Sequence, residues 1–139
     1  MKAAVLVEPE KVEIREVPEP VLRADEVLVT PAYAGLCGTD EHVHKGEFGS
    51  RTTFPLIPGH EFAGRVEAVG EEVSEIEVGE RVTVDPILPC MRCAACLDGR
   101  FCGCQRLKLY GIDQDGAFAE KIAGDPSAGA VKILVKIAD

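Results

Sequence analysis

The sequence predicts a mainly β fold: a small, partly open β-barrel with short helices and two functional loops. Three observations predict it. Apolar and polar residues alternate along most of the chain, as they do in antiparallel strands with one buried face. Prolines fall mostly between these segments or at their ends, where strands tolerate them. Only two short segments favour helix. A chain of 139 residues is long enough to form one domain with its own core.

The predicted elements follow from this alternation in chain order. The alternating segments are Val12–Arg15, Val27–Tyr33, Glu61–Val73, Arg81–Val84, Phe118–Ile122 and Val131–Ile137. In the last segment we expect Val131, Ile133, Val135 and Ile137 to face inward, with Lys132 and Lys136 outward. The two helical segments are a turn or two at Cys37–Lys45 and a single turn near Met91–Leu97.

Composition and charge narrow the class of protein. Hydrophobic residues make up 46% and charged residues 28%, which is typical of a globular domain. The net charge of −9 argues against nucleic acid or an anionic membrane as a partner. No apolar run approaches the ~18–20 residues that span a bilayer, and Met1–Glu8 is too short and too soon acidic for a signal peptide. We expect a cytoplasmic, reducing setting, in which clustered cysteines favour metal over disulfides.

Four cysteines follow one another with the spacing C-x2-C-x2-C-x7-C. They are Cys90, Cys93, Cys96 and Cys104. Four thiolates in tetrahedral arrangement suit a closed, structural zinc site, and Gly99 allows the chain to turn back tightly. An iron–sulfur cluster is a weaker alternative because the expected C-x3-C-Pro continuation is absent. Disulfides are weaker still, since cysteines this close would strain one another. Cys102 remains as a free thiol or as a competitor of Cys104 for the fourth position.

A second set of metal-binding side chains is open. Cys37, His60 and Glu61 supply one thiolate, one imidazole and one carboxylate, which leaves a position free for a substrate on zinc. His60 and Glu61 belong to the pattern G-H-E-x2-G-x5-G-x2-V, which residues 59–73 fit. Zinc at such a site lowers the pKa of a bound hydroxyl towards neutrality.

The residues after Cys37 supply proton transfer in this interpretation. A short helix places Thr39 and His42 on one face, so a hydroxyl beside a bound alcohol leads through an imidazole to solvent. Asp40 could accept the second ring N–H of His60 and fix its tautomer. Each residue alone also has an ordinary explanation: a buried Cys37, surface histidines, or a Glu61 salt bridge. Together with the G-H-E pattern they favour a metal site.

Four stretches of sequence carry a family resemblance. They are Gly35–Asp40 (GLCGTD), Phe54–Glu61 (FPLIPGHE), the four cysteines, and Gly111 with Asp115–Glu120 (DGAFAE). With them, residues 1 to about 122 resemble the catalytic, chaperonin-10-like (GroES-like) domain of the zinc-dependent medium-chain dehydrogenases. Within that family they resemble most the polyol, sugar-alcohol and threonine dehydrogenases.

The resemblance implies a role for each candidate residue. It implies a catalytic zinc held by Cys37 and His60, with Glu61 as ligand or near neighbour. It further implies Thr39 as proton acceptor and His42 as relay, with Asp40 supporting the ligands. The substrate it implies is a small alcohol or polyol, and the cofactor of the complete enzyme is NAD or NADP.

The sequence also departs from the family. A Rossmann domain with its G-x-G-x-x-G turn follows in the complete enzymes, and no such motif occurs among these 139 residues, so we assign no cofactor-binding residue. A third protein ligand to the catalytic zinc also comes later in the family. Residues 125–139 resemble the family's C-terminal strand. We therefore expect a single domain over 1–139, with the nucleotide domain removed and the ends rejoined near Ala123 and Gly124. The alternative is a natural short chain with a coincidental tail.

Three functions compete at this point. The first is an isolated zinc-binding catalytic domain, inactive alone because hydride chemistry belongs to the nicotinamide. The second is an active oxidoreductase whose partner supplies the cofactor domain. The third is a structural or co-chaperonin-like barrel, which rests on fold analogy and leaves the cysteines unexplained. A monomer is expected because family oligomers associate largely through the nucleotide domain, although its loss uncovers apolar surface.

Overall fold

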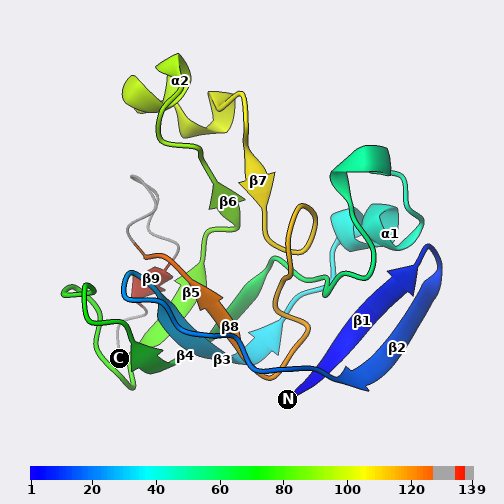
Figure 1. Ribbon diagram of the computed structural model, residues 1–139, viewed down its shortest axis with the longest axis horizontal. Helices are drawn as coiled ribbons and strands as arrows, with labels where there is room; N and C mark the ends of the chain where they lie inside the picture. The colour runs from blue at the N-terminus through cyan, green and yellow to red at the C-terminus, as the bar shows by residue number, and fades with distance from the viewer. Residues whose placement is uncertain (127–133, 137–139) are drawn as a thin grey trace.

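The computed structural model describes residues 1–126 and 134–136, the latter by backbone pairing only (Figure 1). Nine strands, two α-helices and two 3-10 turns follow one another in the described residues. They are β1 (Lys2–Glu8), β2 (Lys11–Glu16), β3 (Val27–Ala34), α1 (Gly38–His44), η1 (Gly49–Arg51), β4 (Phe62–Val69), β5 (Arg81–Val84), β6 (Ile87–Leu88), α2 (Ala94–Leu97), η2 (Phe101–Gly103), β7 (Lys108–Leu109), β8 (Ile122–Gly124) and β9 (Leu134–Lys136). The fold is mainly β with short helices, as the alternation predicted.

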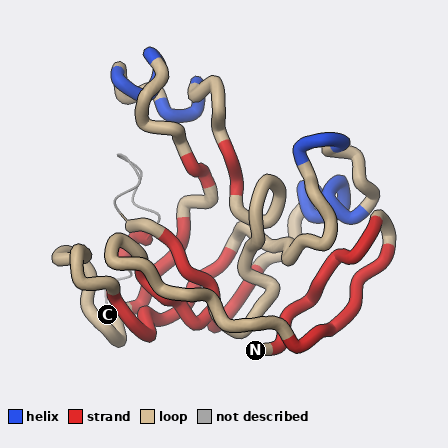
Figure 2. Tube along the Cα trace, viewed as in Figure 1, coloured by secondary structure: helices blue, strands red, loops and turns tan. Residues whose placement is uncertain are grey.

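Three antiparallel sheets make up the described part. The largest has the strand order β8-β3-β4-β5-β9, while β1 pairs with β2 and β6 pairs with β7. Isolated bridges connect the sheets: Ala3 lies opposite Ala119 and Leu6 opposite Leu56. These bridges join the N-terminal hairpin to the loops that run past the large sheet. The result is a barrel that is only partly closed, with long loops between its strands (Figure 2).

The register of β3 against β4 contains a shift that matters for the site. Pro31 lies opposite Gly64, whereas Tyr33 lies opposite Ala63, so two steps along β3 correspond to one step along β4. Beyond the shift, the Gly35 N–H donates to the Glu61 carbonyl at 2.7 Å, which extends the ladder past the ends of both strands. Such bulges re-aim the residues that follow them.

Three apolar clusters form the interior. The barrel cluster contains Val27, Val29, Phe62, Val66, Val82, Val84, Tyr110, Ala117 and Ile122. A second cluster packs Val43 of α1 against Leu6, Leu56 and Ile112. The third joins Ala3 and Val5 to Ile57. Because Leu6 and Val43 are completely buried, α1 is fixed to the N-terminal hairpin by ordinary core packing.

Two loop segments lie backbone against backbone immediately before His60. Gly116 N–H donates to the Ile57 carbonyl at 2.7 Å, Ala117 N–H to Gly59 at 2.9 Å and Phe118 N–H to Pro58 at 3.0 Å. A Cβ added at Gly116 would lie 2.0 Å from the Gly59 carbonyl oxygen. Glycine is therefore required there by contact, and the contact fixes the segment that leads into His60.

Several expected elements differ in detail. The β2 strand forms, but the expected inward face was wrong, since Val12 is 47% and Ile14 73% exposed. Among the described residues, β2 pairs with β1 alone and neither side chain belongs to a core cluster. Tyr33 is likewise exposed, beyond the register shift in β3. The segment expected at Phe118–Ile122 contributes an isolated bridge, and its strand β8 starts only at Ile122.

The C-terminal tail adds a strand to the large sheet. β9 pairs antiparallel with β5, which confirms part of the segment expected at 131–137. The inward direction expected for Val131, Ile133, Val135 and Ile137 lies outside what the structure describes. In the described residues no helix is long and apolar enough to cross a bilayer.

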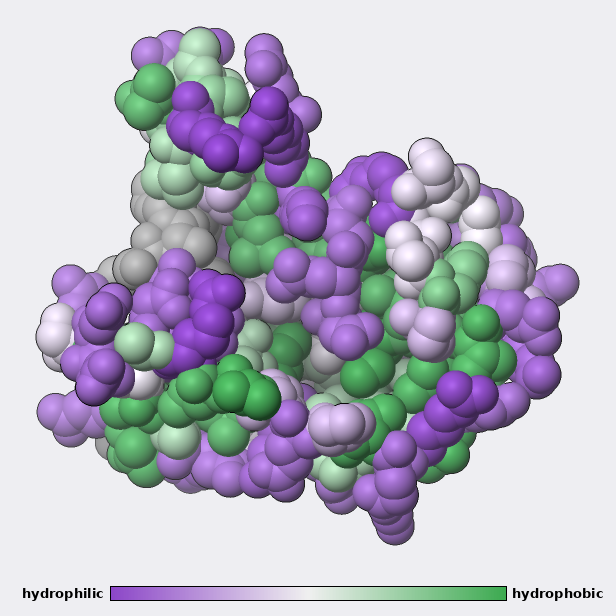
Figure 3. Space-filling model, in the orientation of Figure 1, coloured by the Kyte–Doolittle hydropathy of each residue, from purple (hydrophilic) through white to green (hydrophobic). Residues whose placement is uncertain are grey.

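The segment from β6 to β7 stands away from the barrel as a separate lobe (Figures 1 and 3). The two short strands pair at Ile87 with Leu109 and at Leu88 with Lys108, forming a narrow stem. The lobe at its end carries α2, η2 and all the cysteines except Cys37. The barrel cluster reaches only as far as Leu88 and Tyr110, so the lobe depends on other interactions.

Candidate metal centres

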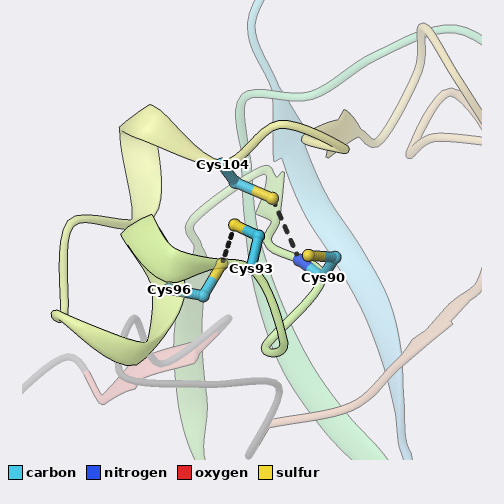
Figure 4. Close-up of side chains that lie close together, drawn as sticks. All are labelled: Cys90, Cys93, Cys96 and Cys104. Carbon is cyan, nitrogen blue, oxygen red and sulfur yellow. Dashed lines mark hydrogen bonds between the residues drawn. The ribbon is translucent and has the colours of Figure 1, made fainter.

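The four sulfurs of the lobe converge on one point. The Sγ atoms of Cys90, Cys93, Cys96 and Cys104 all lie within 4.8 Å of one another (Figure 4). Tetrahedral zinc with Zn–S bonds near 2.3 Å would separate its sulfurs by roughly 3.8 Å, so this group fits with little adjustment. Gly99 turns the chain back with a φ of 73°, the left-handed conformation that glycine favours.

Backbone N–H groups point at these sulfurs, as expected where thiolates are stabilised. Cys104 Sγ accepts from the Cys90 N–H at 3.2 Å and from the Arg106 N–H at 3.3 Å. Backbone donors at Cys96 and Gln105 lower the pKa of Cys93 to about 6. The backbone N–H of Arg92 lowers the pKa of Cys90.

Two further observations concern the protonation of Cys96 and the choice between Cys102 and Cys104 as the fourth ligand. Burial raises the pKa of Cys96 to about 12, so this sulfur is a thiol unless a cation is near. A bound cation deprotonates such a ligand outright. Cys104 belongs to the group and Cys102 does not, and Cys102 is exposed. None of the six cysteines forms a disulfide.

The second centre forms where α1 begins. Cys37 is the N-cap residue of α1, and its Sγ accepts the Thr39 N–H at 3.3 Å. Asp40 completes a capping box, because its Oδ2 accepts the Cys37 N–H at 2.9 Å. The helix start thus fixes Cys37 from both sides. Core packing of Val43 fixes the helix itself.

His60 reaches this centre from the loop before β4. Its Nε2 lies 3.2 Å from Cys37 Sγ. Its Nδ1 faces Asp40 Oδ1 at 3.5 Å, and neither of these two buried atoms has a hydrogen-bond partner within the described residues. Buried polar atoms without partners are costly, so these two facing atoms favour a hydrogen bond with each other, which leaves Nε2 of His60 for a metal. The structure places Asp40 beside the His60 ring, while the expected hydrogen bond between them remains a prediction.

Glu61 completes the second centre. A carboxylate oxygen of Glu61, Cys37 Sγ and a ring nitrogen of His60 all lie within 4.8 Å of one another. Thiolate, imidazole and carboxylate are the ligand types of catalytic zinc, and three protein ligands leave a position for substrate or water. The types of ligand atom in these three residues, and the distances between the atoms, both fit a zinc ion.

The expected proton path is only partly assembled. Thr39 is half-buried and adjoins Cys37 through its backbone N–H. His42 lies one turn further along α1 and is largely exposed, with Nδ1 2.5 Å from Glu47 Oε2. Among the described residues no hydrogen bond joins the Thr39 hydroxyl to the His42 ring. The structure therefore places the two on one helix without connecting them directly.

Sequence reasoning missed the contacts of several residues around the centre. Asp115 Oδ1 accepts the Ile57 N–H at 2.8 Å and so helps to hold the segment before His60. Glu47 is the partner of His42. Gly35 and Gly116 were noticed as parts of motifs, but their contacts are non-local and no spacing rule reveals them.

Comparison with known proteins agrees with the fold. The family described as the alcohol dehydrogenase GroES-like domain matches residues 23–135. The chain is 40% identical over its whole length to the starvation-sensing protein RspB of Escherichia coli K12. It is 42% identical over 86% of its length to D-altritol 5-dehydrogenase of Agrobacterium fabrum, and 39% identical over 88% to sorbitol dehydrogenase of Bacillus subtilis.

Solved structures of dehydrogenases share this fold over nearly the whole chain. Galactitol-1-phosphate dehydrogenase from Escherichia coli superposes with a TM-score of 0.87 at 33% identity, covering 99% of this chain and 38% of that one. The rspB alcohol dehydrogenase from Escherichia coli CFT073, complexed with NADH, gives 0.87 at 36% identity, covering 100% and 39%. In sequence, the chain spans 40%, 35% and 35% of the three relatives named above.

Proposed function

This chain belongs to the family of the alcohol dehydrogenase GroES-like domain, and from that premise we propose that it is the zinc-binding catalytic domain of an NAD(P)-dependent alcohol or polyol dehydrogenase. The observation that carries the proposal is the convergence of Cys37, His60 and Glu61 at the start of α1. The relatives named for altritol and sorbitol support a polyol as substrate.

The two metals would have different tasks. Cys90, Cys93, Cys96 and Cys104 would hold a structural zinc, because four thiolates leave no position for a substrate. Cys37, His60 and Glu61 would hold the catalytic zinc. When bound there, zinc polarises a hydroxyl oxygen and lowers the pKa of that hydroxyl towards neutrality.

The protein's own residues orient the ligands and move the proton. Asp40 holds the Cys37 backbone through Oδ2 and faces His60 Nδ1 through Oδ1, so His60 is kept with Nε2 towards Cys37. We assign the Thr39 hydroxyl as the first group of a proton relay: it accepts the substrate proton as it gives up its own proton towards His42. His42 passes it to solvent, and Glu47 fixes the His42 ring at the surface.

The nicotinamide is not accounted for by these residues. The sequence contains no G-x-G-x-x-G, and every strand pairing described is antiparallel, whereas dinucleotide sites of this kind use parallel βαβ units. We propose that residues 1–139 form one domain, and that on their own they do not oxidise alcohols at a useful rate. Positioning of reactants can supply ~7–11 kcal/mol of barrier reduction, and that contribution requires a nucleotide platform.

Metal analysis and nicotinamide absorbance test the proposal together. We expect two zinc ions per chain, falling to one in Cys37→Ser and in His60→Ala while the four-cysteine site stays loaded. We expect no reduction of NAD or NADP with a panel of polyols. Unchanged metal content in both variants would refute the catalytic site. Turnover that disappears in Cys37→Ser would refute the inactivity of the chain alone.

A further inference from the structure

We propose that Gly35 is a positioning residue for the Glu61 carboxylate, and that its lack of a side chain lets Glu61 reach the metal centre. The inference rests on the function proposed above and concerns a residue that touches neither metal nor substrate. It follows from the ladder between β3 and β4, continued by one residue beyond each strand.

The ladder places Gly35 directly opposite Glu61. Ala34 pairs with Phe62, and the next pair is joined by the 2.7 Å bond from Gly35 N–H to the Glu61 carbonyl. Directly opposed residues in an antiparallel pair project to the same face of the sheet. The Glu61 side chain therefore extends over Gly35 on its way to Cys37 and His60.

The contact distances show what a side chain at position 35 would meet. A Cβ built on Gly35 lies 2.9 Å from Glu61 Oε2, 3.4 Å from Glu61 Cβ and 3.7 Å from the Glu61 carbonyl oxygen. Only the carboxylate is too close. Since Gly35 does not adopt a left-handed conformation, its backbone accepts alanine.

This distinguishes Gly35 from the other close-packed glycines of the described part. Gly64, Gly70 and Gly116 would drive a Cβ into neighbouring backbone, so substitution there acts on the fold. At Gly35 the obstructing atom is the tip of a flexible, exposed side chain, which swings away at little cost. Gly35→Ala should therefore remove a metal ligand from its place without unfolding the chain.

Cobalt binding to the second site measures the effect directly. The chain is first loaded with one equivalent of zinc, and Co²⁺ is then titrated while thiolate-to-cobalt charge-transfer absorption is followed. Cys37→Ser assigns the signal to this centre. We expect Gly35→Ala to weaken Co²⁺ binding by about 10- to 100-fold, the range found when groups that orient metal ligands are changed. Its melting temperature should stay within a few degrees of the wild type.

A matched control and a double variant separate positioning from folding. Gly38→Ala makes the same change on the other side of Cys37, where nothing lies within 4 Å of the added Cβ, and should bind Co²⁺ as the wild type does. Glu61→Ala should weaken binding about as much as Gly35→Ala, and adding Gly35→Ala to it should weaken binding no further.

Three outcomes would overturn the inference. They are wild-type affinity in Gly35→Ala, an undiminished effect of Gly35→Ala in the Glu61→Ala background, and a Gly35→Ala chain that no longer folds. A second metal that persists in Cys37→Ser would instead refute the proposed catalytic site, so the two failures are distinguishable.

Discussion

Replacing Gly116 by alanine tests whether the loop contact before His60 holds the site in place. The new Cβ would lie 2.0 Å from the Gly59 carbonyl oxygen and 2.8 Å from that of Pro58. Real Cβ atoms essentially never come closer than 3.0 Å, so the two segments must separate by about 1 Å. Neither neighbour is a side chain that can rotate away, so the backbone itself has to move.

The cost can be worked out from the bonds that this movement breaks. The bonds between residues 57–59 and 116–118 are 2.7, 2.9 and 3.0 Å long, and an added 1 Å exceeds hydrogen-bonding distance for all three. At about 1 kcal/mol for each bond, with about 1–3 kcal/mol for overpacking, the free energy of unfolding falls by about 4–6 kcal/mol. For a domain of this size the melting temperature should fall by about 10–20 °C.

Thermal unfolding followed by circular dichroism measures this loss, and metal analysis shows whether the second centre survives. Gly38→Ala is the matched control, since nothing surrounds the added Cβ and alanine favours the helix by up to ~1 kcal/mol. A Gly116→Ala chain that melts within about 2 °C of the wild type would show that the contact is not structurally important, and that His60 is positioned by other means.

Three further outcomes are expected. Cys96→Ala should lower the zinc content by one and expose the lobe to proteolysis between residues 90 and 104, whereas full zinc content would contradict the four-sulfur site. Burial raises the pKa of Asp113, but bonds from Arg51 and the Leu109 N–H outweigh it and hold that pKa below its usual value. Asp113→Asn should therefore lower the free energy of unfolding by about 1–2 kcal/mol at pH 7, a figure kept small because Arg51 is partly exposed. This difference between variant and wild type should vanish as the pH falls through the pKa of Asp113 in the folded state. Equal urea midpoints at pH 7 would refute this. Truncation before Leu134 removes the strand paired with β5 and should lower the melting temperature by several degrees, while no change would make the tail a mere linker.

The structural features that depend on local chemistry and residue spacing could be predicted from the sequence. The alternation located β3, β4 and β5, and the cysteine spacing identified the four residues that the structure brings together. The helix after Cys37 begins where the motif indicated. These features are readable because periodicity and ligand spacing are properties of neighbouring residues.

What could not be predicted depends on residues far apart in the chain. Val12 and Ile14 alternate as a half-buried strand would, but whether another layer covers them is decided by tertiary packing. The contact between Gly116 and Gly59 joins loops 57 residues apart, and the position of Glu61 over Gly35 depends on a pairing register. Register is set by turns and bulges that the alternation alone does not reveal.

The register shift in β3 decides which residue faces Gly35. Ala32 is the extra residue between Pro31 and Tyr33, and it has no counterpart on β4. Were Ala32 instead paired with Ala63 in a regular ladder, and the pairing before it kept, every later residue of β3 would move one place along β4, and Gly35 would lie opposite His60. Because neighbouring positions project to opposite faces, the carboxylate would lose its clear path over the strand. By staying out of the ladder, Ala32, itself no ligand, keeps Gly35 opposite Glu61, two residues before Cys37 begins its helix.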